Sequence, residues 1–199
     1  MGSPPLTTGT ARPDTLGTVQ SDLEQILIDR DRIARRIAEM ADQITSDLED
    51  LQQEDDIVLV SVLTGSIIFL ADLIRRLPQK LRIDLVTINS YPGTSTESQG
   101  SKIVGAIPGN LEGKHVLLVD DILDSGGTLR MLRKELALRH PASLRACVLL
   151  RKQRASAMEV PCEYVGFDIP DVFVVGYGLD YNNYYRNLPD IGTLKESAL

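Results

Sequence analysis

The chain is short of cysteine, of positive charge and of long apolar runs, and each absence excludes a class of protein. Its 199 residues include two cysteines, Cys147 and Cys162, which form no CxxC pair and cannot by themselves make a tetrahedral zinc site. The net charge of −7 argues against broad nucleic-acid binding, which needs a basic surface. No apolar run approaches the roughly 20 residues of a membrane helix, and the first residues lack the apolar core of a signal peptide. We therefore expect a cytoplasmic protein that binds neither nucleic acid nor membranes.

What the sequence does contain suits one α/β domain. Residues 1–17 are rich in Pro, Thr and Gly and are expected to be disordered, whereas 18–199 should form a single domain. Short apolar, β-branched runs alternate with helical patterns along the chain. The expected strands are 57–63, 81–90, 115–121 and 143–150, and the expected helices 67–77 and 129–139. This order is typical of a doubly wound, mostly parallel twisted sheet flanked by helices.

The remaining segments carry weaker patterns. Residues 22–51 look helical, with Asp29 as a possible N-cap after a short strand at 26–28. Short strands are expected at 102–107, 164–167 and 173–177, and an irregular tail at 180–199. The polar stretch 91–101 has almost nothing to bury, which favours a binding loop or lid over plain disorder.

The strongest chemical signal follows the clearest strand. Asp120 and Asp121 stand at its end, Asp124 follows three residues later, and Ser125-Gly126-Gly127-Thr128 opens a helix. Small residues at a helix N-terminus let backbone amides converge on one phosphate group. The acid pair cannot bind that phosphate but suits hydroxyl groups or a hydrated magnesium ion. A ligand with a phosphate at one end and vicinal hydroxyls nearby is a ribose 5-phosphate.

This run resembles the signature with which type I phosphoribosyltransferases bind 5-phosphoribosyl-1-pyrophosphate (PRPP). The segments 63–66, 149–152 and 165–171 resemble the hypoxanthine-guanine branch of that family. So does Phe-Val-Val-Gly-Tyr-Gly-Leu-Asp-Tyr at 173–181, followed by Tyr-Arg-Asn-Leu at 185–188. The match runs in order from about residue 26 to 188. It implies the family's fold, with a small hood lobe from the N- and C-terminal segments, and transfer of phosphoribose from PRPP to N9 of hypoxanthine or guanine.

The resemblance also implies a role for each matching residue. Asp124 would be the general acid/base for the purine N7 proton, and Lys152 would donate to the purine O6 and so select a 6-oxo base. The PRPP-binding residues would be Asp120, Asp121, Asp124, Ser125, Gly126, Gly127 and Thr128. The base would meet Phe173, Val174 and Asp180, and pyrophosphate would meet Thr64, Gly65, Ser90, Tyr91 and Arg186. Mg2+ would be held by Asp120, Asp121 and Asp180. The loop at 64–65 often carries a non-proline cis peptide in this family.

In the implied mechanism the bond from ribose C1 to pyrophosphate loosens first, and the purine N9 then attacks. Closure of the 91–101 loop would exclude water from this step. Relatives are commonly dimers or tetramers, so a homodimer or homotetramer is expected.

Three positions depart from the commoner pattern. Many relatives carry Lys where this chain has Thr64, and Glu is commoner where it has Asp120. Some relatives carry Lys where it has Val172. These departures leave hypoxanthine, guanine and xanthine unranked. Two other readings stay open. A regulatory PRPP sensor of the same fold would bind RNA through a basic face, which the net charge disfavours. A phospho-receiver domain also has an acid pair after a strand, but the phosphate loop here follows the acids immediately.

Overall fold

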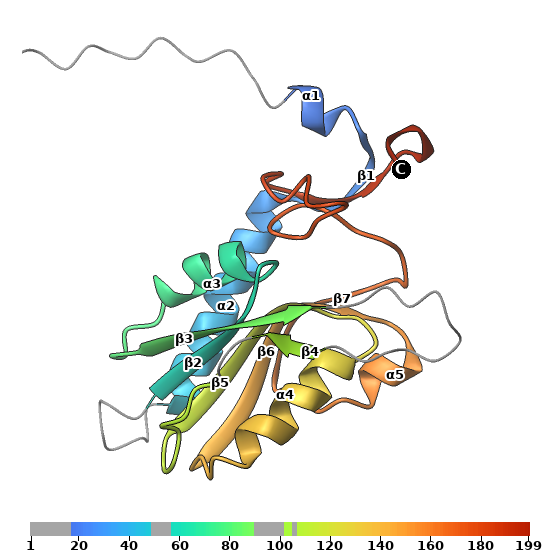
Figure 1. Ribbon diagram of the computed structural model, residues 1–199. Helices are drawn as coiled ribbons and strands as arrows, with labels where there is room; N and C mark the ends of the chain where they lie inside the picture. The colour runs from blue at the N-terminus through green and yellow to red at the C-terminus, as the bar shows by residue number, and fades with distance from the viewer. Residues whose placement is uncertain (1–16, 49–56, 90–101, 105–106) are drawn as a thin grey trace, which may run out of the picture.

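A computed structural model describes residues 17–48, 57–89, 102–104 and 107–199 (Figure 1). Its centre is a six-stranded sheet of order β4-β3-β2-β5-β6-β7. The parallel strands are β2 (Ile57–Leu63), β3 (Arg82–Asn89), β5 (His115–Leu123), β6 (Ser143–Lys152) and β7 (Tyr164–Ile169). The short β4 (Lys102–Val104) runs antiparallel to β3. The expected doubly wound fold is confirmed.

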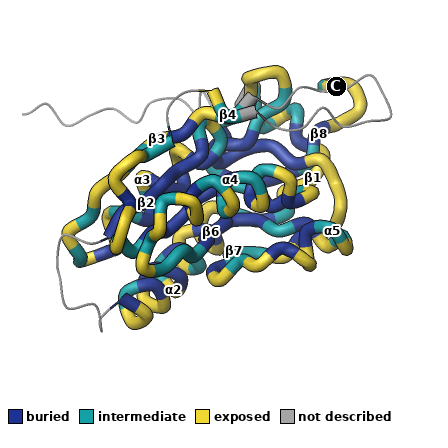
Figure 2. Tube along the Cα trace, turned by 60° about the horizontal axis from the view of Figure 1, so that its bottom comes forward, coloured by how far each residue is buried: buried dark blue, intermediate teal, exposed yellow. Residues whose placement is uncertain are grey.

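Helices cover both faces of this sheet because its inner strands are apolar on both sides. α2 (Arg30–Leu48) and α3 (Ile67–Ile74) bury their apolar faces in one core cluster with Leu117 and Val119 of β5. α4 (Gly127–Ala137) and α5 (Ala155–Met158) pack into a second cluster with Val116 and Leu118. Figure 2 shows the central strands buried between these layers. Among the described helices, none is long and apolar enough to span a membrane.

Asp29 caps α2 as expected, accepting a hydrogen bond from the backbone of Arg32 at 2.8 Å. The helix begins only at Arg30, because 23–28 form a strand, and its expected last residues, 49–51, lie outside the described part of the chain. α3 ends three residues earlier than expected, at Ile74.

A second, two-stranded sheet joins the two ends of the described chain. β1 (Leu23–Ile28) pairs antiparallel with β8 (Ile191–Leu194). The short α1 (Gly17–Gln20) precedes β1, and a 3-10 turn, Glu196–Ala198, follows β8. This small sheet lies beside the large one, at the top of Figure 1, and forms the hood lobe. Buried Asp190 ties the lobe to α2 through Arg30, with contacts of 2.8, 3.0 and 3.2 Å.

Two expectations for the C-terminal third are wrong. Residues 173–177 form no strand: Val175 makes an isolated bridge with Gly192, and the chain then turns through Tyr177 with a positive φ. The tail after residue 180 is not wholly irregular, because it supplies β8. A four-residue strand of this kind is defined by its partner, and its own pattern is too short to predict it.

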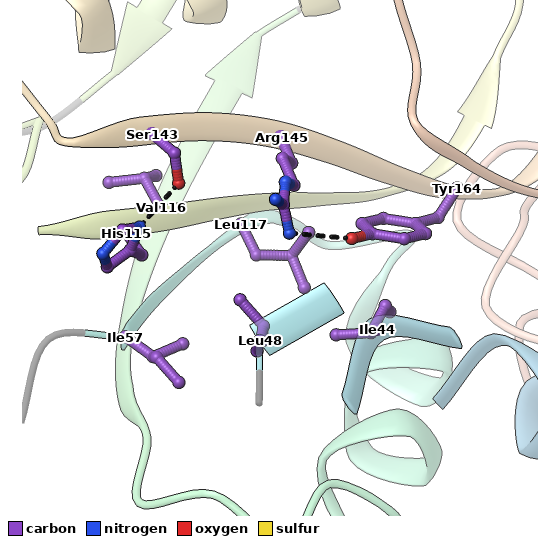
Figure 3. A pocket seen from close by; sticks show the side chains of 9 residues that line it. All are labelled: Ile44, Leu48, Ile57, His115, Val116, Leu117, Ser143, Arg145 and Tyr164. Atoms are coloured by element: carbon purple, nitrogen blue, oxygen red, sulfur yellow. Dashed lines mark hydrogen bonds between the residues drawn. The ribbon is translucent and has the colours of Figure 1, made fainter. Parts of the chain in front are cut away.

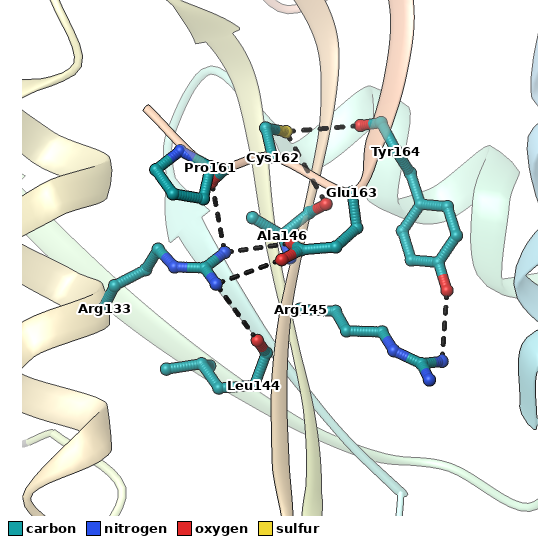
Figure 4. A network of polar contacts seen from close by, with 8 residues as sticks. All are labelled: Arg133, Leu144, Arg145, Ala146, Pro161, Cys162, Glu163 and Tyr164. Carbon is teal, nitrogen blue, oxygen red and sulfur yellow. Dashed lines mark hydrogen bonds and ion pairs between the residues drawn. The ribbon is translucent and has the colours of Figure 1, made fainter. Parts of the chain in front are cut away.

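A polar network fixes α4 to the strands beneath it (Figure 4). Arg133 forms a two-pronged ion pair with Glu163 at 2.9 and 3.1 Å, and Glu163 accepts a hydrogen bond from the backbone of Ala146 at 2.6 Å. Burial tends to raise the pKa of Glu163, but the bonds from Arg133 and Ala146 lower it overall. This contact holds α4, which begins at Gly127, against the sheet.

The opposite edge of the sheet, where the strands begin, holds a narrow hollow with a volume of about 10 Å³ (Figure 3). His115 and Ser143 share a hydrogen bond of 2.8 Å there, and Arg145 contacts the Tyr164 hydroxyl at 3.2 Å. Apolar side chains of α2, β2 and β5 form the rest of its wall. These polar groups satisfy one another, so this edge is structural.

Candidate active site

The predicted site residues gather where β2, β5 and β6 end. Asp120 and Asp121 lie inside β5, which continues to Leu123, so the expectation that the strand stops at residue 121 is wrong. β6 likewise runs on to Lys152, and Leu123 pairs with Arg151 across the two strands. The longer strands bring Asp124 and Lys152 to the same edge of the sheet.

The acid pair is held in a poorly solvated setting. Asp120 is 6% exposed, and one of its oxygens accepts a hydrogen bond from the backbone of Asp121 at 3.0 Å. Burial raises the pKa of Asp120 well above its usual range, and the neighbouring charge of Asp121 adds to the effect. Burial also raises the pKa of Asp121, against an opposing effect from Arg186. Two crowded carboxylates of this kind would gain from a cation or from hydroxyl donors.

The loop after β2 packs directly against Asp121. The peptide bond between Leu63 and Thr64 is cis, as the resemblance implies. A Cβ atom built on Gly65 would lie 1.7 Å from a carboxylate oxygen of Asp121, so a larger residue fits there only if Asp121 or the loop shifts. The next residue, Ser66, is buried and shares a hydrogen bond of 2.8 Å with Ser61. The structure thus brings Thr64 and Gly65 beside the acid pair.

The predicted phosphate loop precedes a helix as expected. Gly126 has a φ of +83°, and a Cβ there would lie 2.3 Å from a methyl carbon of Val160. α4 begins at the next residue, two positions earlier than expected. The first backbone N–H groups of a helix have no partner within it, so a helix N-terminus of this kind favours an anion nearby. Arg130 braces the loop by donating to the carbonyl of Ser125 at 3.1 Å.

Asp124 lies in a closed ring of alternating charges. The ammonium of Lys152 is 2.9 Å from one of its oxygens, and the guanidinium of Arg154 is 2.7 Å from the other. Asp171 completes the ring, 3.5 Å from Lys152 and in an ion pair with Arg154. Lys152 is only 8% exposed, so its charge depends on these partners.

The residues expected to meet the base follow Asp171 directly. Phe173 is 52% exposed, and its ring meets the edge of Tyr181 at a centroid distance of 5.7 Å. Val174 is buried. An open aromatic face beside a buried ammonium can hold a flat polar heterocycle.

Arg186 and Asp180 lie on the turn after these residues. They form an ion pair of 2.8 Å, and Arg186 also donates to the carbonyl of Gly178 at 2.8 Å. Asp180 accepts from the backbone of Asn183 at 2.8 Å. Ser90, Tyr91 and the rest of the expected lid lie outside the described residues. Among the described residues, no cluster of three or more His, Cys, Asp or Glu side chains could hold a metal by itself.

Comparison with known proteins decides the family. Residues 24–182 match the family model described as the phosphoribosyl transferase domain. This chain belongs to the phosphoribosyltransferase family. It is 44% identical over 176 residues to a hypoxanthine-guanine phosphoribosyltransferase of Mycobacterium avium, covering 87% of this chain and 86% of that one. It is also 44% identical to a hypoxanthine phosphoribosyltransferase of Haemophilus influenzae, covering 84% of this chain and 93% of that one.

Solved structures agree with the sequence comparison. The crystal structure of a hypoxanthine phosphoribosyltransferase from Staphylococcus aureus has a TM-score of 0.82 and 38% identity. It covers 94% of this chain and 98% of its own. The resemblance noted from the motifs is therefore confirmed along nearly the whole phosphoribosyltransferase chain.

Sequence reasoning missed two residues that this phosphoribosyltransferase places at its site. Arg154 and Asp171 contact Asp124 and Lys152, yet they lie on different loops, after β6 and after β7. The only signal in the sequence is that Arg154 stands two residues after Lys152, and surface arginines at such positions are common. Their convergence depends on the pairing of β6 with β7.

Proposed function

We propose that this enzyme transfers the 5-phosphoribosyl group from PRPP to N9 of hypoxanthine or guanine, giving IMP or GMP and pyrophosphate. The relatives named above support this substrate class. The observation that carries the proposal is the pairing of Asp124 with Lys152, 2.9 Å apart, beside a phosphate loop. The two side chains can form hydrogen bonds with two neighbouring atoms, O6 and N7, on one edge of a 6-oxopurine.

Base recognition follows from the hydrogen-bonding capacity of this pair. An ammonium has donors only, so Lys152 accepts a 6-oxo group and rejects a 6-amino group. Asp124 is a proton acceptor within reach of the adjacent N7. Phe173 would stack on the ring, and the backbone of Val174 would meet its far edge. The 2-substituent then meets backbone groups, which leaves guanine and hypoxanthine as comparable substrates.

PRPP would lie across the ends of β5 and β2. Amides of residues 125–128 would hold the 5-phosphate, and Asp120 and Asp121 would accept hydrogen bonds from the ribose hydroxyls. Thr64, Gly65 and Arg186 would hold the pyrophosphate, with Ser90 and Tyr91 from the loop beyond β3. As the bond to C1 loosens, these groups stabilise charge on the departing pyrophosphate.

The acid pair also fits Mg2+. Magnesium usually binds one or two carboxylates together with substrate phosphates and water. Asp120 and Asp121 meet that need, because burial raises the pKa of both carboxyl groups and a cation would compensate their charge. Asp180 would hold a second magnesium ion on pyrophosphate once its ion pair with Arg186 opens. The ion would supply charge neutralisation on pyrophosphate.

We also propose that the enzyme works in the cytoplasm as a homodimer or homotetramer. Exposed apolar side chains support the assembly: Ile83 and Leu85 of β3 are 41% and 52% exposed. Ile67 and Ile68 at the start of α3 are exposed as well. Exposed apolar side chains of this size are often covered by another subunit.

Steady-state assays with PRPP, Mg2+ and hypoxanthine, guanine, xanthine or adenine test the proposal. We expect transfer to the 6-oxo bases and at least about 100-fold less to adenine, and Asp124→Asn should lower turnover roughly 100-fold or more. Asp168→Asn is the matched control, since Asp168 pairs with Arg151 away from the site. Binding of PRPP with no transfer to any base would instead indicate a regulatory protein.

A further inference from the structure

We infer that Arg154 and Asp171 are positioning residues that hold Asp124 and Lys152 ready for the base. The inference rests on the proposed function, because it concerns how the acid/base and the O6 donor are kept in place. Neither Arg154 nor Asp171 is among the residues proposed to hold the 5-phosphate or the pyrophosphate. Both belong to the ring of alternating charges, in which Arg154 contacts Asp124 and Asp171 contacts Lys152.

The ring fixes the orientation of Asp124. Arg154 holds one carboxylate oxygen at 2.7 Å and leaves the other facing Lys152. Arg154 is itself anchored, because its Nε lies 3.0 Å from a carboxylate oxygen of Asp171. A guanidinium presents its donors in a rigid fork, so it can bridge two carboxylates at a set angle. A lysine at this position could not make both contacts in that way.

Asp171 keeps a negative charge beside the buried ammonium of Lys152 when the base binds. In the structure Lys152 donates to Asp124, and it must turn toward O6 to recognise a purine. A buried ammonium that lost its only partner would be strongly disfavoured. Asp171, 3.5 Å away, stays beside Lys152 during that change. Hydrogen bonds from Arg154 lower the pKa of Asp171, which agrees with a carboxylate kept ionised.

Together these contacts let the bond between Lys152 and Asp124 open without leaving either charge unpaired. Arg154 retains Asp124, and Asp171 retains Lys152. Asp171 is also two residues before Phe173, so the same ring ties the aromatic platform to the acid/base. The expected consequence is a role in base capture and transfer, separate from PRPP binding.

The test compares Arg154→Gln, Arg154→Lys and Asp171→Asn with the wild type. Arg151→Gln is the matched control, since Arg151 lies in β6 one residue before Lys152 and pairs with Asp168 at 2.6 and 3.1 Å. We expect Arg154→Gln to lower kcat/KM for the base roughly 10-fold, with most of the loss in kcat. The Kd of PRPP should stay within about 2-fold, and Arg154→Lys should recover part of the activity. The control should keep wild-type kinetics.

The kcat/KM of the double variant Arg154→Gln/Asp171→Asn should be only slightly below that of the less active single variant, because the two residues act as one unit. If the wild type is active and Arg154→Gln has the same kinetics, the inference about the positioning residues is overturned while the proposed function stands. Equal losses in PRPP affinity and base kinetics would also overturn it, since that pattern indicates general support of the fold. A wild type that transfers to none of the bases would overturn the proposed function first.

Discussion

The contact between Gly65 and Asp121 allows a sharp test of how the site is assembled. In Gly65→Ala, the new Cβ would lie 1.7 Å from one Asp121 oxygen and 2.6 Å from its carboxyl carbon. Unbonded atoms normally stay about 3.5 Å apart, so the overlap is well over 1 Å. Either the loop after β2 shifts or the Asp121 side chain leaves its position. Both outcomes disturb the acid pair.

The magnitude follows from which group moves. Inserting a methyl group into a packed site costs about 1–3 kcal/mol, which for a chain of this size lowers Tm by about 2–12 °C. If Asp121 rotates away instead, Tm changes less, but the ribose loses a partner and the Kd of PRPP should rise at least about 10-fold. Thermal melts and calorimetric titration with PRPP and Mg2+ measure the two effects. Gly109→Ala is the control, because a Cβ there would meet nothing within 4 Å.

A double-mutant cycle isolates the contact. In an Asp121→Ala background the carboxylate is gone, so any loss of Tm caused by Gly65→Ala should largely disappear. If Gly65→Ala keeps both wild-type Tm and wild-type PRPP affinity, the packing of this loop against Asp121 is not as described. The same conclusion would follow if its loss of Tm were undiminished when Asp121 is alanine.

Two further predictions concern stability and thiol reactivity. Asp190→Asn should lower the free energy of unfolding by about 1–2 kcal/mol, because buried Asp190 accepts three bonds from half-exposed Arg30. Burial tends to raise the pKa of Asp190, but Arg30 lowers it overall. The stabilisation is therefore fully present above the usual pKa of about 3.9 and is lost as pH falls through the lowered pKa. Urea melts of both proteins should converge in that acidic range, and a constant difference would contradict the assignment. Burial raises the pKa of Cys147, and burial with nearby Glu163 raises that of Cys162 to about 11, so thiolate is scarce at pH 7. Both thiols should react slowly with a disulfide reagent in the native protein, and rapid reaction of both would refute this.

The parts of the fold that could be predicted are those whose burial follows from the local pattern of apolar residues. Residues 57–63 and 115–121 are apolar throughout, and both form central parallel strands. The start of a helix after Ser125 and Gly126 was predictable for a similar reason, since small residues favour a tight turn there, and the role of this turn in binding phosphate stays a prediction. The motif from 119 to 128 also placed the acid pair correctly at that edge of the sheet.

The errors arose where a partner decides the structure. β5 and β6 continue through charged residues because each strand completes the hydrogen-bond ladder of the other, from Asp120 opposite Val148 to Leu123 opposite Arg151. β8 depends on β1, which lies about 165 residues earlier. The positive φ at Tyr177 turns the chain where its apolar pattern predicts a strand. Tertiary context overrides local propensity at each of these places.

The central claim is that residues 120–128 hold PRPP together with Mg2+. Calorimetric titration of the full chain with PRPP, with and without Mg2+, measures this directly. The predicted result is saturable heat that strengthens with the metal, with a Kd for PRPP that Gly65→Ala raises at least about 10-fold. No saturable heat under either condition would contradict the account, whatever the sequence resembles.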